Sequence, residues 1–453
     1  MRSELSTIAR HALTVLAGQL AVMAFGVTDT IVAGRYSPAA LAALSVASAV
    51  FISVYISLMG ILQALLPLWS ELRGADRPAA IGGSLRQSLY LCLGICLAGM
   101  SVLLSPEPLL RWTDVPEALK DDVRRYLAIL AWGLPAAMLF RIYSTLNQSL
   151  GRPLLVTWLQ VGALALKLPL SVWFTFGGAG LPALGVAGCA WATLVVNYTL
   201  LGVGLWLLRT RPLYAPLQLW RRMERIDWGQ IGQFLRLGLP AGMAILVEVT
   251  SFTLVALFVA RQGNLAAASH QIAANLAGVC YMVPLSLAIA VSARVSWWRG
   301  AGNEAQAQQL VALGWRLAAL LGLLLGGLLL AGRHWLTSVY TSDAPVAALA
   351  GALLLWVAAY HVADSVQCFC VFVLRCYRIT VAPLLTYCVL LWGGGLAGGY
   401  WLAYGGIGPW SGRPTPAPFW AMSALALWIT ALAFSLLLWR TLRRHRAPGA
   451  LPS

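Results

Sequence analysis

The sequence predicts an all-α membrane protein in which twelve transmembrane helices form two pseudo-symmetric six-helix lobes. Of the 453 residues, 60% are hydrophobic and only 10% are charged, whereas soluble domains carry about 25% charged residues. Apolar runs of about 20 residues, the length that crosses a bilayer, recur along the whole chain. The two halves of the chain also resemble each other. These three observations predict the fold class.

Each predicted span is an apolar run bounded by Gly, Pro or a cluster of charges. An α-helix rises about 1.5 Å per residue, so runs of this length cross the hydrocarbon core of a membrane. The predicted spans lie at residues 11–34, 45–68, 86–105, 125–147, 154–176, 185–208, 233–260, 268–292, 310–331, 346–373, 380–403 and 419–439.

The distribution of Lys and Arg predicts the orientation of the spans, because positive residues accumulate in cytoplasmic loops. Most basic residues lie in the loops after even-numbered spans, such as "RTRPLYAPLQLWRRMER" at 209–225, and in the tail "WRTLRRHR". We therefore expect a multi-pass membrane protein with both termini in the cytoplasm. The same bias explains the net charge of +16, so no nucleic-acid partner is expected.

An internal repeat predicts the division into lobes. The stretch "AGRYSPAALAALSVAS" at 33–48 aligns with "VARQGNLAAASHQIAA" at 259–274, and each leads in the same register to an Arg-Gly-Ala tripeptide. The even number of spans in each half makes the repeats parallel, and two such lobes suit alternating access. The predicted parts are an N-terminal lobe at 1–208, a cytoplasmic loop at 209–232 and a C-terminal lobe with a basic tail at 233–453.

Three acidic side chains lie inside predicted spans, whereas the rest of the 15 acidic residues lie in loops or tails. They are Asp29 in the first span, Glu248 in the seventh and Asp364 in the tenth. An ionised side chain at the centre of a membrane helix costs about 2.5–3.5 kcal/mol on insertion scales, and such residues are usually functional. Carboxylates in this setting exchange protons or hold a desolvated cation. Both properties are suited to driving transport.

One basic residue, Lys167, lies well inside the fifth span, within "LALKLPLSVW". An ammonium group there needs a carboxylate partner or must lose its proton. Asp29 is the only deep acid in the same half of the sequence, so we predict an Asp29–Lys167 charge pair. Arg141 is a second basic residue inside a predicted span.

Polar and aromatic side chains accompany the acids in the C-terminal half. Tyr360 and His361 precede Asp364 by about one helical turn and share its face of the helix. Further polar side chains lie in the eighth span. The residues predicted to line a substrate cavity are Gln271, Asn275, Tyr281 and His361.

Several segments together resemble a known family. They include "FGVTDTIVAGRYSPAALAALSV", "GLPAGMAILVEVTSF" and "YHVADSVQC". In this combination the chain, over about residues 10–400, resembles the MATE (multidrug and toxic-compound extrusion) transporters of the NorM-like branch. The resemblance implies an antiporter of twelve helices that expels mostly cationic or amphipathic compounds in exchange for Na⁺ or H⁺, with no cofactor besides the coupling ion.

The resemblance also implies roles for individual residues. Asp29 matches the acid of the family's first helix and Glu248 that of the seventh, while Tyr360 and Asp364 match a tenth-helix pair of a cation site. Carboxylate oxygens favour hard cations such as Na⁺, so Glu248 and Asp364 are the residues expected to bind Na⁺ in a sodium-coupled transporter.

The chain departs from the family in the fifth helix. Where the family usually has two asparagines spaced four residues apart, Lys167 and Ser171 stand here. A fixed ammonium would take the place of a coupling cation beside Asp29. We therefore expect coupling at Glu248 and Asp364.

Two functions remain open from the sequence. The first is a secondary antiporter, acting as a monomer, whose partners are small organic cations and membrane lipids. The alternative is a flippase for lipids or lipid-linked oligosaccharides with the same architecture, because Lys167, Arg141 and Arg375 would suit anionic head groups. An enzyme is not expected, since the loops carry no G-x-S-x-G, H-E-x-x-H or Walker pattern.

Overall fold

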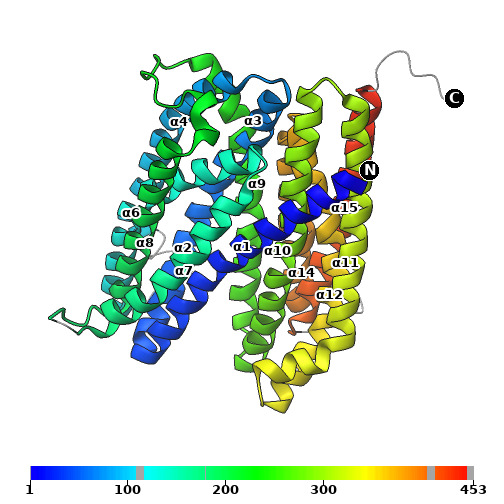
Figure 1. Cartoon of the computed structure of the whole chain (residues 1–453). Coiled ribbons are helices and arrows are strands. Elements are labelled where there is room, and N and C mark those ends of the chain that lie inside the picture. The colour runs from blue at the N-terminus through cyan, green and yellow to red at the C-terminus, as the bar shows by residue number, and fades with distance from the viewer. Residues whose placement is uncertain (1, 109–116, 179, 406–413, 446–453) are drawn as a thin grey trace. The chain divides into compact units, whose positions relative to one another are not determined.

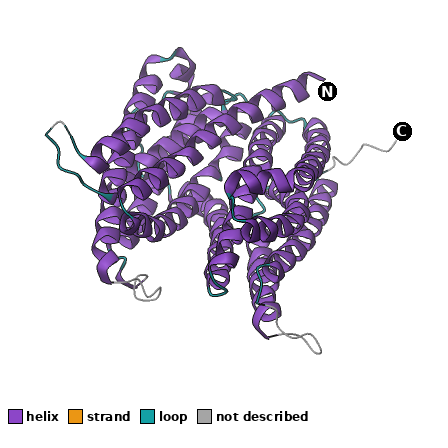
Figure 2. Cartoon of the chain, turned by 90° about the horizontal axis from the view of Figure 1, so that it is seen from below, coloured by secondary structure: helices purple, strands orange, loops and turns teal. Residues whose placement is uncertain are grey.

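The computed structural model describes residues 2–108, 117–178, 180–405 and 414–445 (Figure 1). Within these residues the regular structure is helical, apart from one isolated β-bridge between Gly178 and Leu181 (Figure 2). Twelve of the described helices are long and apolar enough to cross a membrane. The predicted fold class is confirmed, and each of the twelve predicted spans overlaps one of these helices.

The chain divides into two compact units, residues 13–242 and residues 1–12 together with 243–453. The unit that contains residues 13–242 holds most of α1 (Arg2–Tyr36), α2 (Pro38–Gln63), α3 (Leu65–Gly74), α4 (Pro78–Leu104), α6 (Glu117–Ser149), α7 (Pro153–Phe176), α8 (Val186–Thr210) and the short 3-10 helix η1 (Pro212–Leu217). Helix α6 is its central element and packs against α2, α4 and α8.

The other unit holds most of α9 (Trp228–Ala260), α10 (Asn264–Gly300), α11 (Glu304–Tyr340), α12 (Ala344–Cys376), α13 (Val381–Tyr387), η2 (Cys388–Ala397), α14 (Gly398–Tyr400), η3 (Trp401–Gly405) and α15 (Ala417–Arg444). Helix α12 is central here and packs against α10, α11 and α15. Because helices surround it, its polar side chains near Asp364 are enclosed by protein.

The first residues of α1 belong to the unit that contains α10 and α12. Ile8 is buried in the core of that unit. The guanidinium of Arg294 donates to Glu4 from Nε at 2.7 Å and from Nη2 at 2.5 Å, and it lies 4.1 Å from the ring centroid of Trp297. The rings of Trp297 and Trp298 therefore both lie against the arginine that anchors the start of α1.

The connection between α7 and α8 is a glycine-rich turn. Gly177 ends α7 with φ of +77°, and a Cβ there would lie 2.8 Å from the backbone nitrogen of Ala183. This left-handed conformation and the close approach both require glycine. The turn brings the two helices side by side, which places Lys167 of α7 beside Thr193 of α8.

Candidate functional site

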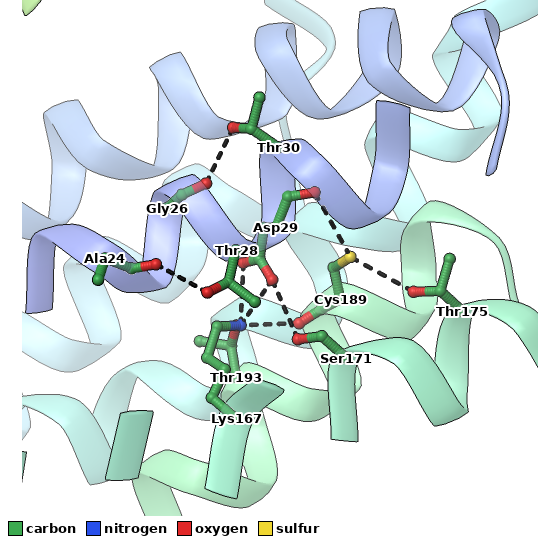
Figure 3. Close-up of polar contacts among 10 residues, drawn as sticks. All are labelled: Ala24, Gly26, Thr28, Asp29, Thr30, Lys167, Ser171, Thr175, Cys189 and Thr193. Atoms are coloured by element: carbon green, nitrogen blue, oxygen red, sulfur yellow. Dashed lines mark hydrogen bonds and ion pairs between the residues drawn. The ribbon is translucent and has the colours of Figure 1, made fainter. Parts of the chain in front are cut away.

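The structure brings Asp29 and Lys167 together in the unit of residues 13–242 (Figure 3). Lys167 Nζ lies 2.8 Å from Oδ1 and 2.9 Å from Oδ2 of the Asp29 carboxylate. The side chain of Lys167 is 0% exposed and that of Asp29 is 9% exposed. The contact is thus a desolvated ion pair between α1 and α7.

Neighbouring hydroxyl groups complete the hydrogen bonding of this pair. Lys167 Nζ also donates to Thr193 Oγ1 at 2.7 Å, and the Ser171 hydroxyl donates to Asp29 Oδ1 at 3.2 Å. The three hydrogens of the ammonium group therefore have three acceptors. Buried ion pairs need such additional partners, because removing two charges from water costs several kcal/mol per ion.

The second site lies around Asp364 on α12. Asp364 is 2% exposed, and the amide of Gln367 donates to its Oδ1 at 2.8 Å. The phenol of Tyr387 on α13 in turn donates to Gln367 Oε1. Tyr387 therefore fixes which end of the amide faces Asp364.

Glu248 of α9 belongs to the same cluster. It is partly buried and interacts electrostatically with Asp364, with Arg375 and with the Gln367 amide. Among the described residues neither carboxylate forms an ion pair within 4 Å, in contrast to Asp29. Two acids that share a neutral amide donor and have no paired ammonium can take up a cation or a proton.

Tyr360 joins this cluster to an aromatic pocket in the same unit. The pocket has about 410 Å³ of empty volume, part of it open to the surroundings, and is lined by Tyr360, Phe252 and Trp420 among others. The ring of Tyr360 meets Phe252 edge to face at 5.8 Å and Trp420 at 5.7 Å. Aromatic faces attract organic cations, so the pocket is chemically suited to them.

The four residues predicted for the substrate cavity lie elsewhere in this unit. Gln271 and Asn275 are exposed on one face of α10, and Tyr281 accepts a weak hydrogen bond from the Cys368 thiol at 3.7 Å. His361 is fully buried, and both ring nitrogens lack a hydrogen-bond partner among the described residues. Their assignment to a substrate cavity remains a prediction.

Several residues at these sites were not predicted from the sequence. Gln367 lies three residues after Asp364, and this helical spacing was a usable signal. Thr193, Tyr387 and Trp420 lie on other helices than the acids that they adjoin, so no local spacing connects them with these acids.

The remaining His, Cys and acidic side chains do not gather into a further site in the described residues. His, Cys, Asp and Glu form no cluster of three or more with metal-binding geometry in those parts of the chain. All eight cysteines are free thiols. The three acids within the predicted spans are therefore arranged as one acid in an ion pair in one unit and two neighbouring acids in the other.

These features define a multi-pass α-helical membrane protein with charged side chains enclosed in both units. The family model MatE matches residues 15–173 and 240–401. A probable multidrug resistance protein NorM of Aromatoleum aromaticum is 37% identical over 96% of this chain and 94% of the relative. Another, of Chromobacterium violaceum, is 33% identical over 99% of this chain and 97% of the relative.

The chain therefore belongs to the MatE family, in its NorM-like branch. Solved structures agree in fold. The eukaryotic MATE transporter AtDTX14 superposes with a TM-score of 0.87 at 17% identity, covering 98% of each chain. The Vibrio cholerae MATE transporter VcmN in its bent form gives 0.78 at 18% identity, also covering 98% of each chain.

Proposed function

We propose that this protein is a secondary antiporter that exports cationic or amphipathic organic compounds from the bacterial cytoplasm in exchange for Na⁺ or H⁺. Membership in the MatE family supports this function, and so do the full-length relatives named as multidrug resistance proteins. The positive-residue bias supports an inner-membrane protein with both termini in the cytoplasm. It acts as a monomer, with organic cations and membrane lipids as its partners.

The observation that carries the coupling mechanism is the contrast between the two carboxylate sites. The Asp29 carboxylate is held by the Lys167 ammonium and the Ser171 hydroxyl. A coupling cation would have to displace this ammonium to bind there. Asp364 and Glu248 share a neutral amide instead. Coupling therefore takes place at Glu248 and Asp364, and Asp29 has a structural role.

Tyr360 connects ion binding with substrate binding. It precedes Asp364 by about one helical turn on α12 and also lines the aromatic pocket. An ion or proton that binds at the acids changes the charge beside this pocket. An ion that binds two conformations with different affinity shifts their equilibrium by that difference, and in this way ion entry drives release of the organic cation.

The test is dye efflux from proteoliposomes under separately imposed Na⁺ and H⁺ gradients. Asp364→Asn is compared with Asp343→Asn, which changes an acid on the same helix but at its N-cap, where the side chain accepts from the Val346 amide. We expect Asp364→Asn to abolish gradient-driven efflux and Asp343→Asn to retain it, because asparagine also caps helices.

Two outcomes would change the proposal. Undiminished efflux in Asp364→Asn would contradict the coupling role of this acid. Absence of efflux in the parent for every cation tested, under both gradients, would favour the flippase. Of the three basic residues that suggested a flippase, Lys167 is paired with Asp29 and offers no free charge for an anionic head group.

A further inference from the structure

Arg141, on the central helix α6, is a buried guanidinium without an acidic partner. Its residue is 6% exposed, and Nε and Nη2 have no hydrogen-bond partner among the described residues. The titratable group that faces it is the neutral phenol of Tyr55. Arginine stays protonated in proteins, so this site carries a permanent positive charge.

Other buried basic side chains in this unit have acidic partners. Lys167 pairs with Asp29, and Arg86 pairs with Glu224. Buried charges are normally paired, because an unpaired one keeps its full desolvation cost. Among the described residues, therefore, none supplies an anionic partner to the Arg141 guanidinium.

A pocket lies directly at this guanidinium. It has about 240 Å³ of empty volume, part of it continuous with the surroundings, and is lined by side chains of α1, α6 and α7. Gln19, Gln148 and Gln160 line it together with Arg141. The amide N–H of Gln148 already donates to Ser144 Oγ at 3.3 Å, so Gln19 and Gln160 are the amides that can accompany the guanidinium. The amide oxygen of Gln148 also lacks a partner among the described residues.

The backbone of α1 makes room for this lining. A Cβ at Gly18 would lie 2.2 Å from Gln160 Oε1 and 3.2 Å from Thr157 Oγ1. Glycine at this position thus allows the Gln160 side chain to occupy the space beside α1. The hydroxyl of Thr157 is already used, since it donates to the Thr14 carbonyl at 2.6 Å.

The internal repeat gives an independent argument. The register that aligns Arg35 with Arg261 also aligns Arg141 with Gln367. Gln367 is the amide between Glu248 and Asp364 in the other unit. The place equivalent to Arg141 on the other central helix is therefore a neutral amide that lies between two acids, whereas Arg141 itself is a guanidinium without an acidic partner among the described residues.

We propose that the Arg141 pocket binds an anionic oxygen group, a carboxylate or phosphate, at the head of an amphipathic ligand. A guanidinium binds such groups through two parallel N–H···O bonds. Arg141 lies eight residues before the end of α6 at Ser149, which is about 12 Å along the helix.

The role of the pocket as a subsite for exported compounds rests on the proposed antiporter function. The binding of an anion at Arg141 does not depend on that function.

The test measures binding of two dyes to the purified full-length protein in nanodiscs of neutral lipid. Tetramethylrhodamine has a free carboxylate, and its methyl ester has the same cationic ring system without that charge. We expect Arg141→Gln to raise the Kd of the carboxylate dye about 10-fold, as for a lost charge-assisted hydrogen bond, and to leave the ester within about twofold. Fluorescence anisotropy gives both values.

Two further variants keep the result interpretable. Arg375→Gln removes the other buried arginine with an unpartnered nitrogen, and we expect it to leave the difference between the dyes unchanged. Arg141→Lys keeps the charge without the paired donors and should have an intermediate effect. If a thermal melt shows that Arg141→Gln is not folded, Arg141→Lys alone decides the test. We then expect Arg141→Lys to weaken binding of the carboxylate dye and not of the ester.

The source of the anion is distinguished by adding phosphatidylglycerol to the nanodiscs. Competition with the carboxylate dye in the parent, but not in Arg141→Gln, supports the pocket and assigns it to a lipid head group. Absence of competition, with the selective effect of Arg141→Gln retained, assigns it to soluble ligands. Equal effects of Arg141→Gln on both dyes, or none, would overturn the proposal. If the selectivity persists while neither dye is exported, the site stands and the antiporter function fails for these dyes.

Discussion

The ammonium of Lys167 lies 2.8 Å and 2.9 Å from the two carboxylate oxygens of Asp29 (Figure 3). The same ammonium reaches Thr193 on α8, so one positive charge ties α1, α7 and α8 together. We therefore expect this carboxylate to have a structural role, whereas neither Glu248 nor Asp364 forms an ion pair within 4 Å among the described residues. The intramembrane carboxylates of the two units thus have different partners.

Removing the ammonium alone should destabilise the protein more than removing both charges. Lys167→Met leaves Asp29 buried without a cation, and breaking one partner of such a pair typically costs about 3–5 kcal/mol. Adding Asp29→Asn to Lys167→Met should recover part of this loss. Thermal unfolding in detergent of the parent, both single variants and the double variant measures the coupling. Strictly additive effects of the two substitutions would contradict the pairing.

Gln367 should set the ion affinity of the acid cluster, because its amide interacts with both carboxylates. The amide N–H favours the ionised carboxylate, so in Gln367→Leu we expect the H⁺ concentration for half-maximal efflux to fall about 10-fold, as for one lost hydrogen bond to a charged group. Ser365→Ala is the control, since its hydroxyl donates to the His361 carbonyl of the same helix. An unchanged ion dependence in Gln367→Leu would show that the amide does not act in coupling.

Much of the fold follows from hydropathy, but helix ends do not. The predicted span at 86–105 belongs to a helix that begins at Pro78. Hydropathy marks the hydrocarbon thickness, whereas backbone hydrogen bonding continues into polar surroundings. Here the polar end of α4 is used for packing: Arg86 donates to the Gln218 carbonyl at 2.8 Å, and Gln87 donates to that of Arg225 at 2.9 Å.

The candidate site was predictable to the extent that charge is rare within the spans. One deep acid and one deep lysine in the same half of the sequence predicted the contact between Asp29 and Lys167. The contacts of Tyr387 and Thr193 depend on how distant helices pack, which no spacing within one segment encodes. For the same reason the sequence did not connect Glu4 with Arg294, which lies on α10.

Close packing of α7 against α8 should depend on Gly188. A Cβ there would lie 2.5 Å from the backbone carbon of Phe174 and the backbone nitrogen of Thr175, and backbone atoms cannot move aside as a flexible side chain can. We expect Gly188→Ala to lower stability by about 1–3 kcal/mol, as overpacking does. Thermal unfolding in detergent measures the change.

The matched control lies on the same helix. A Cβ at Gly202 would meet nothing within 4 Å, so Gly202→Ala should raise stability slightly through helix propensity, by at most about 1 kcal/mol. Equal melting temperatures of the two variants would contradict the close approach. Because Thr193 lies on α8, Gly188→Ala should also reduce the coupling measured between Asp29 and Lys167.

The loop between α8 and α9 is fixed to α4 by a charged contact that should respond to acid. Glu224 accepts hydrogen bonds from Arg86 Nε at 3.0 Å and from Nη2, and these bonds hold the pKa of Glu224 below its usual value. The backbone amide of Asp227 next to it donates to Gln87 Oε1 at 3.0 Å. The backbone at Asp227 should therefore stay protected from hydrogen exchange while Glu224 is ionised.

The sign of the pH effect follows from the lowered pKa. A carboxyl group whose pKa is lower in the folded state stabilises that state fully above its unfolded pKa, about 4.3, and loses this contribution as the pH falls through the folded value. Protection at Asp227, corrected for intrinsic exchange rates, should be constant from about pH 7 to pH 5 and fall below about pH 4. Glu224→Gln should show low protection at Asp227 at every pH. The control is Asp76→Asn, which changes an exposed acid in a turn of the same unit and should match the parent. Loss of protection in the parent already between about pH 7 and pH 5 would assign the loop contact to another group.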